Sequence, residues 1–171
     1  MSVVLIDGNA VRAGELGKVG IVVKVEALQT GFSTSAPEPA QRARDKVLAH
    51  PVAAGACLAE AVDLVTMQGK SLRLELDSEN ENRFCKWWRE TPARMVVAVA
   101  VRRAPAGEIE VFTASCDGEI AAKPAGPHLL GWDRLFVPVG EEATLAQLAE
   151  AGELVEFRRE LYTKIAATLV G

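Results

Sequence analysis

The chain has 171 residues, 49% of them hydrophobic, which is enough for the core of one domain or of two lobes sharing a sheet. We expect residues 1–171 to form a single domain. A net charge of −4 without blocks of like charge argues against a nucleic-acid partner. Binding of a small charged ligand remains compatible with this composition. No apolar run approaches the ~20 residues that span a bilayer, and the N-terminus lacks a basic start. The sequence therefore predicts a cytosolic protein without a membrane partner.

Three cysteines, Cys57, Cys85 and Cys116, are odd in number and widely spaced, and no histidine accompanies them at ligand spacing. This pattern predicts buried free thiols rather than a disulfide framework or a zinc site.

Strand-like and helix-like segments alternate along the first half of the chain. Two apolar runs, 2–6 and 19–27, predict strands with a short helix or loop between them. Pro37-Glu38-Pro39 predicts the start of a helix that runs through His50 and stops at Pro51. The apolar run 54–65 predicts a central strand, and the alternating residues 71–76 predict a half-buried strand.

The second half continues with one helix, two paired strands and further helices. Polar residues at 77–80 predict the cap of a helix that runs through Glu90. Residues 94–103 and 108–116 predict a β-hairpin, and the chain from Glu141 onward predicts helices broken near Gly152. Together these elements predict the α/β class, with a mixed twisted sheet and flanking helices.

The turn Gly131-Trp132-Asp133 follows a stretch rich in proline and glycine and precedes Phe136 and Pro138. Glycine permits a close approach of the backbone, and a flat ring beside a carboxylate suits a planar base or a sugar. The alternative is a buried tryptophan in a tight turn. The pattern Gly-Trp-Asp-x-x-Phe-x-Pro resembles the inosine/xanthosine triphosphate pyrophosphatase family, whose members hydrolyse non-standard purine nucleoside triphosphates to monophosphate and pyrophosphate.

The order and spacing of the elements resemble this family almost from end to end, through the paired strands and the linker before the turn. The resemblance implies two lobes around a central cleft, a magnesium cofactor, a nucleoside triphosphate ligand and a homodimer. On the helix that ends near Glu90, the adjacent Trp87 and Trp88 cannot both face one core. One of them is expected to cover a groove or a subunit contact.

After the first strand, Asp7-Gly8-Asn9-Ala10-Val11-Arg12 resembles the family's Thr/Ser-Gly-Asn-x-x-Lys loop, which binds triphosphate. The resemblance assigns Gly8, Asn9 and Arg12 to the phosphates, with Asp7 in place of the family's hydroxyl. The start of a helix also attracts anions. A plain turn with an asparagine cap is the alternative.

The segment 58–65 resembles the family's strand ending in Glu-Asp-Thr/Ser-Gly-Leu, whose carboxylates bind magnesium and prepare the attacking water. Glu60 fits the first acid, and Ala61 stands in place of the aspartate. Asp63 would share the face of Ala61 on an extended strand, so it is a candidate for the missing role. The resemblance thus assigns Glu60 and Asp63 to catalysis and Glu38, Glu60 and Asp63 to the metal, whereas the helix dipole alone also explains Glu38.

The C-terminal segment keeps least of the family pattern Glu-Lys-Asn-x-x-Ser-His-Arg. Arg158 matches the last residue, whereas Gly152, Glu156 and Phe157 replace the lysine, serine and histidine. The resemblance assigns Arg158, Trp132 and Asp133 to the base.

Two functions follow from the sequence: a divergent nucleoside triphosphate pyrophosphatase, or a nucleotide-binding or protein-interaction module that has kept the fold and lost the chemistry. The first predicts that the N-terminal loop, the middle acids and the tryptophan turn converge on one crevice. Chance similarity between α/β folds is a third reading, and it predicts that they lie far apart.

Overall fold

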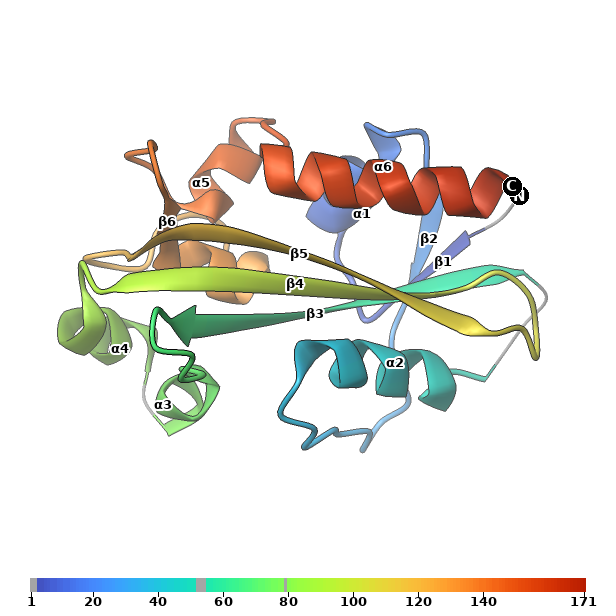
Figure 1. The fold of residues 1–171 in the computed structure, drawn as a ribbon, viewed down its shortest axis with the longest axis horizontal. Helices are drawn as coiled ribbons and strands as arrows, with labels where there is room; N and C mark the ends of the chain where they lie inside the picture. Colours follow the sequence, from blue (N-terminus) through green and yellow to red (C-terminus); the bar gives the residue numbers. More distant parts are fainter. Residues whose placement is uncertain (1–2, 52–54, 79) are drawn as a thin grey trace. The chain divides into compact units, whose positions relative to one another are not determined.

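A computed structural model describes residues 3–51, 55–78 and 80–171 of the chain, with a six-stranded sheet and helices beside it (Figure 1). In chain order the elements are β1 (Val3–Ile6), α1 (Ala10–Gly17), β2 (Val23–Glu26), α2 (Pro39–Ala49), β3 (Ala56–Thr66), α3 (Arg73–Ser78), α4 (Glu81–Trp88), β4 (Pro92–Arg102), β5 (Ile109–Ile120), the 3₁₀ segment η1 (His128–Leu135), β6 (Phe136–Pro138), α5 (Leu145–Glu150) and α6 (Glu156–Val170).

The sheet is mixed, as the sequence predicts. Its strand order is β2-β1-β3-β4-β5-β6. Strand β1 runs parallel to both neighbours, with Leu5 opposite Val25 on one side and Leu58 on the other, whereas β5 and β6 are antiparallel. The predicted hairpin is confirmed as the neighbours β4 and β5, joined by a turn in which Gly107 N–H donates to Ala104 O at 3.0 Å.

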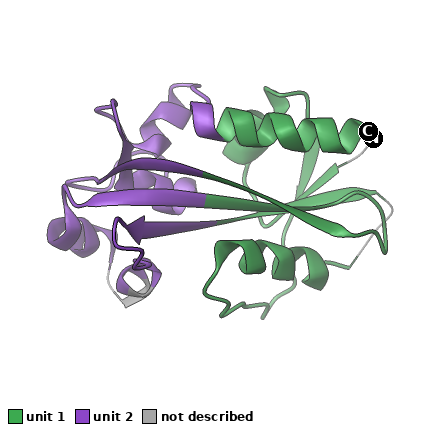
Figure 2. Ribbon diagram, viewed as in Figure 1, with its two compact units in different colours: residues 1–61, 97–114, 158–171 green, residues 62–96, 115–157 purple. Residues whose placement is uncertain are grey.

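The contacts divide the chain into two compact units, which Figure 2 distinguishes by colour. Unit 1 comprises residues 1–61, 97–114 and 158–171, and unit 2 comprises residues 62–96 and 115–157. Strands β3, β4 and β5 contribute residues to both units, so the chain passes between them several times. The assignment of residues 1–171 to a single domain stays a prediction.

One core cluster of unit 1 lies between helix α2 and the strands β1, β3 and β4. Small side chains dominate the strand side and allow the helix to approach closely. Ala61 belongs to this core and is only 7% exposed, so the position where the family resemblance expects a catalytic aspartate is packed against apolar groups. The buried members are Ile6, Ala43, Val47, Cys57, Ala59, Ala61, Ala98 and Ala100.

The core of unit 2 contains an aromatic cluster around Phe84 of α4. The ring of Trp88 stacks on Phe84, and Trp132 meets it edge to face, each with ring centroids 6.4 Å apart. The neighbouring Trp87 is 75% exposed, so the two adjacent tryptophans do point to different surroundings. Elsewhere in unit 2, the close approach of β5 to Val137 requires a glycine at position 118, because a Cβ there would lie 2.2 Å from Val137 O.

Several helices begin or end where capping residues, proline or glycine in the sequence predict it. Asn9 and Asn80 cap α1 and α4 through their side chains, Pro39 occupies the first turn of α2, and Gly152 lies in the break between α5 and α6. The predicted strand over 19–27 is shorter, Val23–Glu26, and no pattern in the sequence predicts β6.

The strand predicted at 71–76 is wrong: after a single bridge between Ser71 and Val65, the chain forms helix α3. Leu76 N–H donates to Leu72 O at 3.1 Å, a helical bond. Residues 72–76 are leucine, arginine and glutamate, which favour helices, and none is β-branched. The alternation that suggested a strand also fits a helix, because Leu72 and Leu76 are four residues apart.

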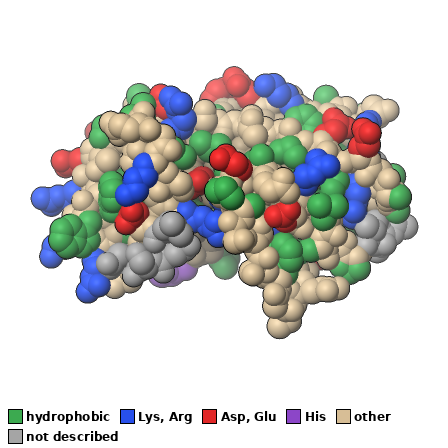
Figure 3. All heavy atoms as spheres, turned by 60° about the horizontal axis from the view of Figure 1, so that its bottom comes forward, with side chains coloured by type: hydrophobic (Ala, Val, Ile, Leu, Met, Phe, Trp, Pro, Cys, Tyr) green, Lys and Arg blue, Asp and Glu red, His purple; other side chains and the backbone are tan. Residues whose placement is uncertain are grey.

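Cys57 and Cys85 are buried free thiols, as predicted. For Cys116 the prediction of burial is wrong, because this free thiol lies on β5, whose residues are mostly exposed or partly exposed. Within the described residues, no helix has the length and apolar character needed to cross a membrane. The face in Figure 3 carries acidic and basic side chains interspersed with apolar ones.

Candidate functional site

The loop after β1 positions the first predicted site residues at the start of α1. Gly8 fits closely against β1, because a Cβ there would lie 2.4 Å from the side chain of Leu5. The Asn9 side chain accepts from Arg12 N–H at 3.0 Å, which caps α1 as the sequence predicts. This loop therefore has the glycine and the helix start that the phosphate-binding interpretation requires.

Lys46 of α2 is a cation that the sequence reasoning left without a role. Its Nζ lies 3.0 Å from Asp7 Oδ2 and donates to the backbone oxygen of Glu60 at 3.1 Å. It thereby offsets the negative charge that Asp7 brings to the loop. A lysine facing inward on a mostly polar helix could have been noticed, but only the fold shows that it reaches the residue after β1 and the backbone of β3 at Glu60.

Glu60 lies at the centre of a buried ionic cluster in unit 1. Arg158 Nη1 lies 3.0 Å from Glu60 Oε1 and 2.8 Å from Oε2, and Arg12 Nε lies 3.2 Å from Oε1. Tyr162 O–H donates to Oε2 at 2.8 Å. Arg12 also pairs with Glu15, at 2.7 Å. The structure thus brings together three of the predicted residues, Arg12, Glu60 and Arg158, with two that the sequence reasoning missed, Glu15 and Tyr162.

This cluster fixes the charge of Glu60. Burial alone would raise the pKa of this carboxyl group, but the charges of Arg158 and Arg12, with hydrogen bonds from Arg158 and Tyr162, outweigh it and lower the pKa to about 2. Burial and then the charge of Glu60 raise the pKa of Tyr162 well above its ordinary value. At neutral pH the cluster therefore contains an ionised glutamate and a protonated tyrosine.

The contacts of Glu60 do not fit a metal ligand. Its oxygens already accept from two guanidinium groups and a hydroxyl, and a divalent cation there would lie beside two positive charges. Glu38, the N-cap residue of α2, makes no side-chain capping bond and is exposed. Among the described residues, no group of three or more His, Cys, Asp and Glu is placed to hold a metal ion.

Asp63 belongs to unit 2, unlike Glu60. It is 3% exposed and accepts a hydrogen bond from Ser71 Oγ at 2.8 Å. This bond fastens the end of β3 to the segment before α3.

The tryptophan turn forms η1 in unit 2. Gly131 has φ 44° and ψ −113°, a left-handed conformation that interrupts the segment and favours glycine. Trp132 packs its ring against Phe84, and Asp133 is 2% exposed. Arg134 donates to Gly126 O at 3.0 Å and pairs with Glu81, which ties the turn to the preceding loop and to α4. The prediction that this turn, the first loop and the acids share one crevice stays a prediction.

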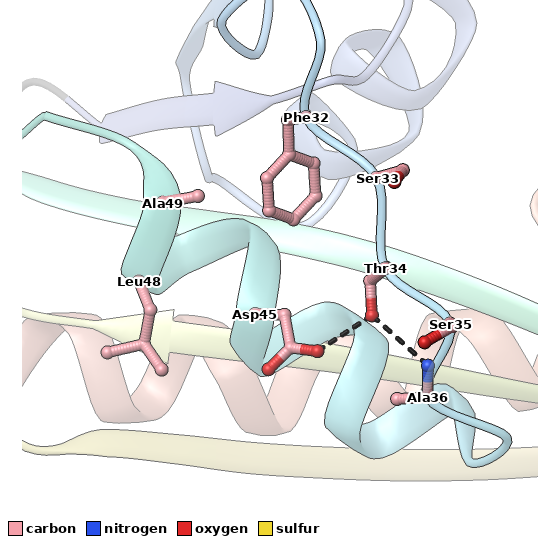
Figure 4. A pocket seen from close by; sticks show the side chains of 8 residues that line it. All are labelled: Phe32, Ser33, Thr34, Ser35, Ala36, Asp45, Leu48 and Ala49. Carbon is pink, nitrogen blue, oxygen red and sulfur yellow. Dashed lines mark hydrogen bonds between the residues drawn. The ribbon is translucent and has the colours of Figure 1, made fainter.

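Unit 1 also contains an open hollow of about 620 Å³ between the loop 32–36 and helix α2. Figure 4 shows Thr34 and Asp45 pointing toward each other across it, with a hydrogen bond of 2.7 Å. Gln41 donates to the other Asp45 oxygen, also at 2.7 Å. The described residues that line the hollow include no basic side chain, so it is poorly suited to phosphate.

Comparison with known proteins finds similarity in both sequence and fold. A dITP/XTP pyrophosphatase of Bdellovibrio bacteriovorus is 41% identical over 76 residues, which are 42% of this chain and 38% of that protein. One of Ignicoccus hospitalis is 36% identical over 80 residues, 46% and 42% of the two chains. The matches thus span about two fifths of these curated relatives.

Two solved structures share the fold over nearly their whole length. The Ham1 protein of Staphylococcus aureus has a TM-score of 0.65 at 19% identity and covers 100% of this chain and 99% of its own. A HAM1 protein from Coxiella burnetii has a TM-score of 0.66 at 15% identity, covering 99% and 98%.

A family model described as the Ham1 family matches residues 69–160. The match includes the turn Gly131-Trp132-Asp133 and Arg158, and it begins after the first loop, Glu60 and Asp63. It covers more than half of the sequence. The chain therefore belongs to the Ham1 family.

Proposed function

We propose that this chain binds a purine nucleoside triphosphate and hydrolyses it to the nucleoside monophosphate and pyrophosphate. The observation that carries the proposal is the turn Gly131-Trp132-Asp133, which lies within the family match and has an ordered aromatic support. Because two matching relatives are named dITP/XTP pyrophosphatases, inosine and xanthosine triphosphates are the substrates to test first.

In this proposal the tryptophan turn places the base. Phe84 fixes the ring of Trp132 from its edge, and a fixed ring loses little conformational entropy when a base stacks on it. The space beside Gly131 is open, since a Cβ there would meet nothing within 4 Å. Asp133 is assigned to the polar edge of the base or to the sugar. Arg158 can meet the nucleotide only if its contact with Glu60 opens.

The loop Gly8-Asn9 and the first turn of α1 are assigned to the phosphates. Free N–H groups at a helix start bind oxyanions, and Lys46 supplies a positive charge beside the same loop. Arg12, the family's cationic position, is held by Glu15 and Glu60 instead. Lys46 is also paired, with Asp7, but this contact is more exposed than those of Arg12, so Lys46 is the better candidate for phosphate contact.

The reaction requires a water molecule to attack the α-phosphorus, after which the bond between this phosphorus and the bridging oxygen breaks and pyrophosphate leaves. We assign the orientation of this water to Asp63, whose carboxylate is itself oriented by Ser71. Glu60 is a weak base, with its pKa held at about 2, and its contacts leave it no part in the proton transfer. Its assignment to catalysis by resemblance is therefore not retained in the proposal.

The second candidate is a module that binds nucleotide without turnover. Two observations favour it: Ala61 is packed into the core, and the carboxylate of Glu60 is neutralised by two arginines. Removing a catalytic acid commonly lowers the rate by ~10²–10⁴. This candidate predicts nucleotide affinity with no release of pyrophosphate.

The test is pyrophosphate release and nucleotide binding, measured on standard and modified nucleoside triphosphates with magnesium or manganese. We expect turnover with a purine preference and its loss in Trp132→Leu. Trp87→Leu is the matched control, because Trp87 is 75% exposed and lies outside the aromatic cluster; its oligomeric mass is measured alongside, since Trp87 is also a candidate subunit contact. Binding without turnover would select the second candidate, and neither binding nor turnover would overturn both. A gain of activity in Ala61→Asp would show that the scaffold still aligns the reaction.

We also propose a cytosolic homodimer, as the family resemblance implies. The exposed Trp87 on α4 suits a subunit contact. Light scattering after gel filtration should give twice the mass of the chain, and Trp87→Glu should reduce it to the monomer mass.

A further inference from the structure

The cluster around Glu60 has the shape of an oxyanion site. Arg12 and Arg158 bring two guanidinium groups to one carboxylate, and Tyr162 adds a hydroxyl donor at 2.8 Å. Guanidinium groups bind carboxylate and phosphate oxygens with the same geometry. The donors that hold Glu60 are therefore also suited to a phosphate group.

We propose that Glu60 is an internal anion that occupies a site for phosphate or pyrophosphate formed by Arg12, Arg158 and Tyr162. An external oxyanion can enter only by displacing this carboxylate. The contact between Glu60 and the two arginines thus inhibits the binding of external anions. In this proposal Glu60 has this role instead of the metal-binding role that the family resemblance assigns to it. The inference stands whether or not the chain hydrolyses nucleotides.

The charges of the cluster support this interpretation. Arg12 and Arg158 are balanced by Glu15 and Glu60, so the cluster is neutral as it stands. If Glu60 loses its charge, these four side chains carry two positive charges and one negative charge, and a bound anion would offset the excess. A divalent cation would instead add positive charge next to two arginines.

The exposure of the residues indicates where an anion would enter. The side chain of Arg158 is 1% exposed and that of Arg12 is 8% exposed, whereas Glu60 is 15% exposed. Glu60 is therefore the member of the three that solvent reaches most. Replacing its carboxylate by an uncharged amide of the same size weakens the attraction to the arginines, so an external anion should displace the side chain more easily.

The experiment is isothermal titration with inorganic phosphate and with pyrophosphate, in EDTA, on the wild type and on Glu60→Gln. Removing the competing internal anion should strengthen binding at least ~10-fold, corresponding to 1.4 kcal/mol. Glu15→Gln is the matched control, because Glu15 contacts Arg12 at 2.7 Å and is not the carboxylate between the two arginines. We expect a smaller gain there. The double variant Glu60→Gln, Arg158→Met should lose the gain.

Thermal unfolding gives a second measurement that remains useful if Glu60→Gln is destabilised. Pyrophosphate should raise the Tm of Glu60→Gln more than that of the wild type. A higher affinity for pyrophosphate than for phosphate would identify the site as one for the pyrophosphate leaving group. Equal affinities would identify it as a general oxyanion site. Unchanged anion affinity in Glu60→Gln would overturn the inference. So would magnesium binding by the wild type that disappears in Glu60→Gln, since it would make Glu60 a metal ligand.

Discussion

Replacing Glu60 by glutamine should destabilise the fold by an amount that depends on pH. The structure lowers the pKa of Glu60 from 4.5 to about 2. At ~1.4 kcal/mol per pKa unit, this corresponds to about 3–4 kcal/mol of folding free energy at neutral pH. Breaking one side of a buried ion pair typically costs about 3–5 kcal/mol, which agrees in size.

The sign of the pH dependence follows from the direction of the pKa shift. Because the folded pKa is depressed, the stabilisation is fully present above about pH 4.5 and is lost as the pH falls through about 2. The free-energy difference between the wild type and Glu60→Gln should therefore be constant from pH 7 to 5 and shrink below pH 4.5. Urea unfolding followed by tryptophan fluorescence, in buffers without phosphate or sulfate, measures it.

The control for this experiment is Glu110→Gln. Glu110 pairs with Arg103 at 3.0 Å, but both side chains are more than a third exposed, so the loss should stay below about 1 kcal/mol. A Glu60→Gln difference below about 1 kcal/mol, or one that does not change between pH 7 and pH 2, would refute the reasoning.

Three further predictions test the packing and the thiols. Gly118→Ala should lower Tm by several degrees in calorimetry, because its Cβ would lie 2.2 Å from Val137 O, whereas Gly14→Ala in α1 meets nothing within 4 Å and should be neutral or stabilising. Thr144→Ala should lose about 1 kcal/mol in urea unfolding, because Thr144 forms the capping box of α5 and donates to Ala125 O at 2.8 Å; an unchanged midpoint would contradict this. Burial and then the charge of Glu81 raise the pKa of the Cys85 thiol to about 11, so mass spectrometry at pH 7 should find iodoacetamide on the partly exposed Cys116 well before Cys85.

The sequence predicts those elements whose signals are local. Asn9, Asn80 and Pro39 mark helix starts through bonds or ring geometry within the same turn, and all three are confirmed. The strand predicted at 71–76 is wrong because a short leucine alternation fits both periods, and the helix propensity of its leucine, arginine and glutamate residues favours the helix. Strand β6 has three residues and depends on pairing with β5, which no local signal shows.

For the same reason, the sequence predicts some residues of the candidate site but not the contacts between them. Family resemblance singled out Arg12, Glu60 and Arg158, but assigned them to phosphate, metal and base. The structure pairs Glu60 with Arg158 across 98 residues and adds Tyr162, and nothing near these positions in the sequence indicates such a contact. Ion pairs between distant segments form only once the fold is in place, so the sequence could suggest the residues but not their partners.

The most direct test of the proposed function is phosphorus NMR of xanthosine or inosine triphosphate incubated with the wild-type chain and magnesium. The proposal predicts that monophosphate and pyrophosphate appear in equal amounts, and that no diphosphate appears. Orthophosphate together with diphosphate, or a nucleotide that remains intact with every base tested, would contradict it.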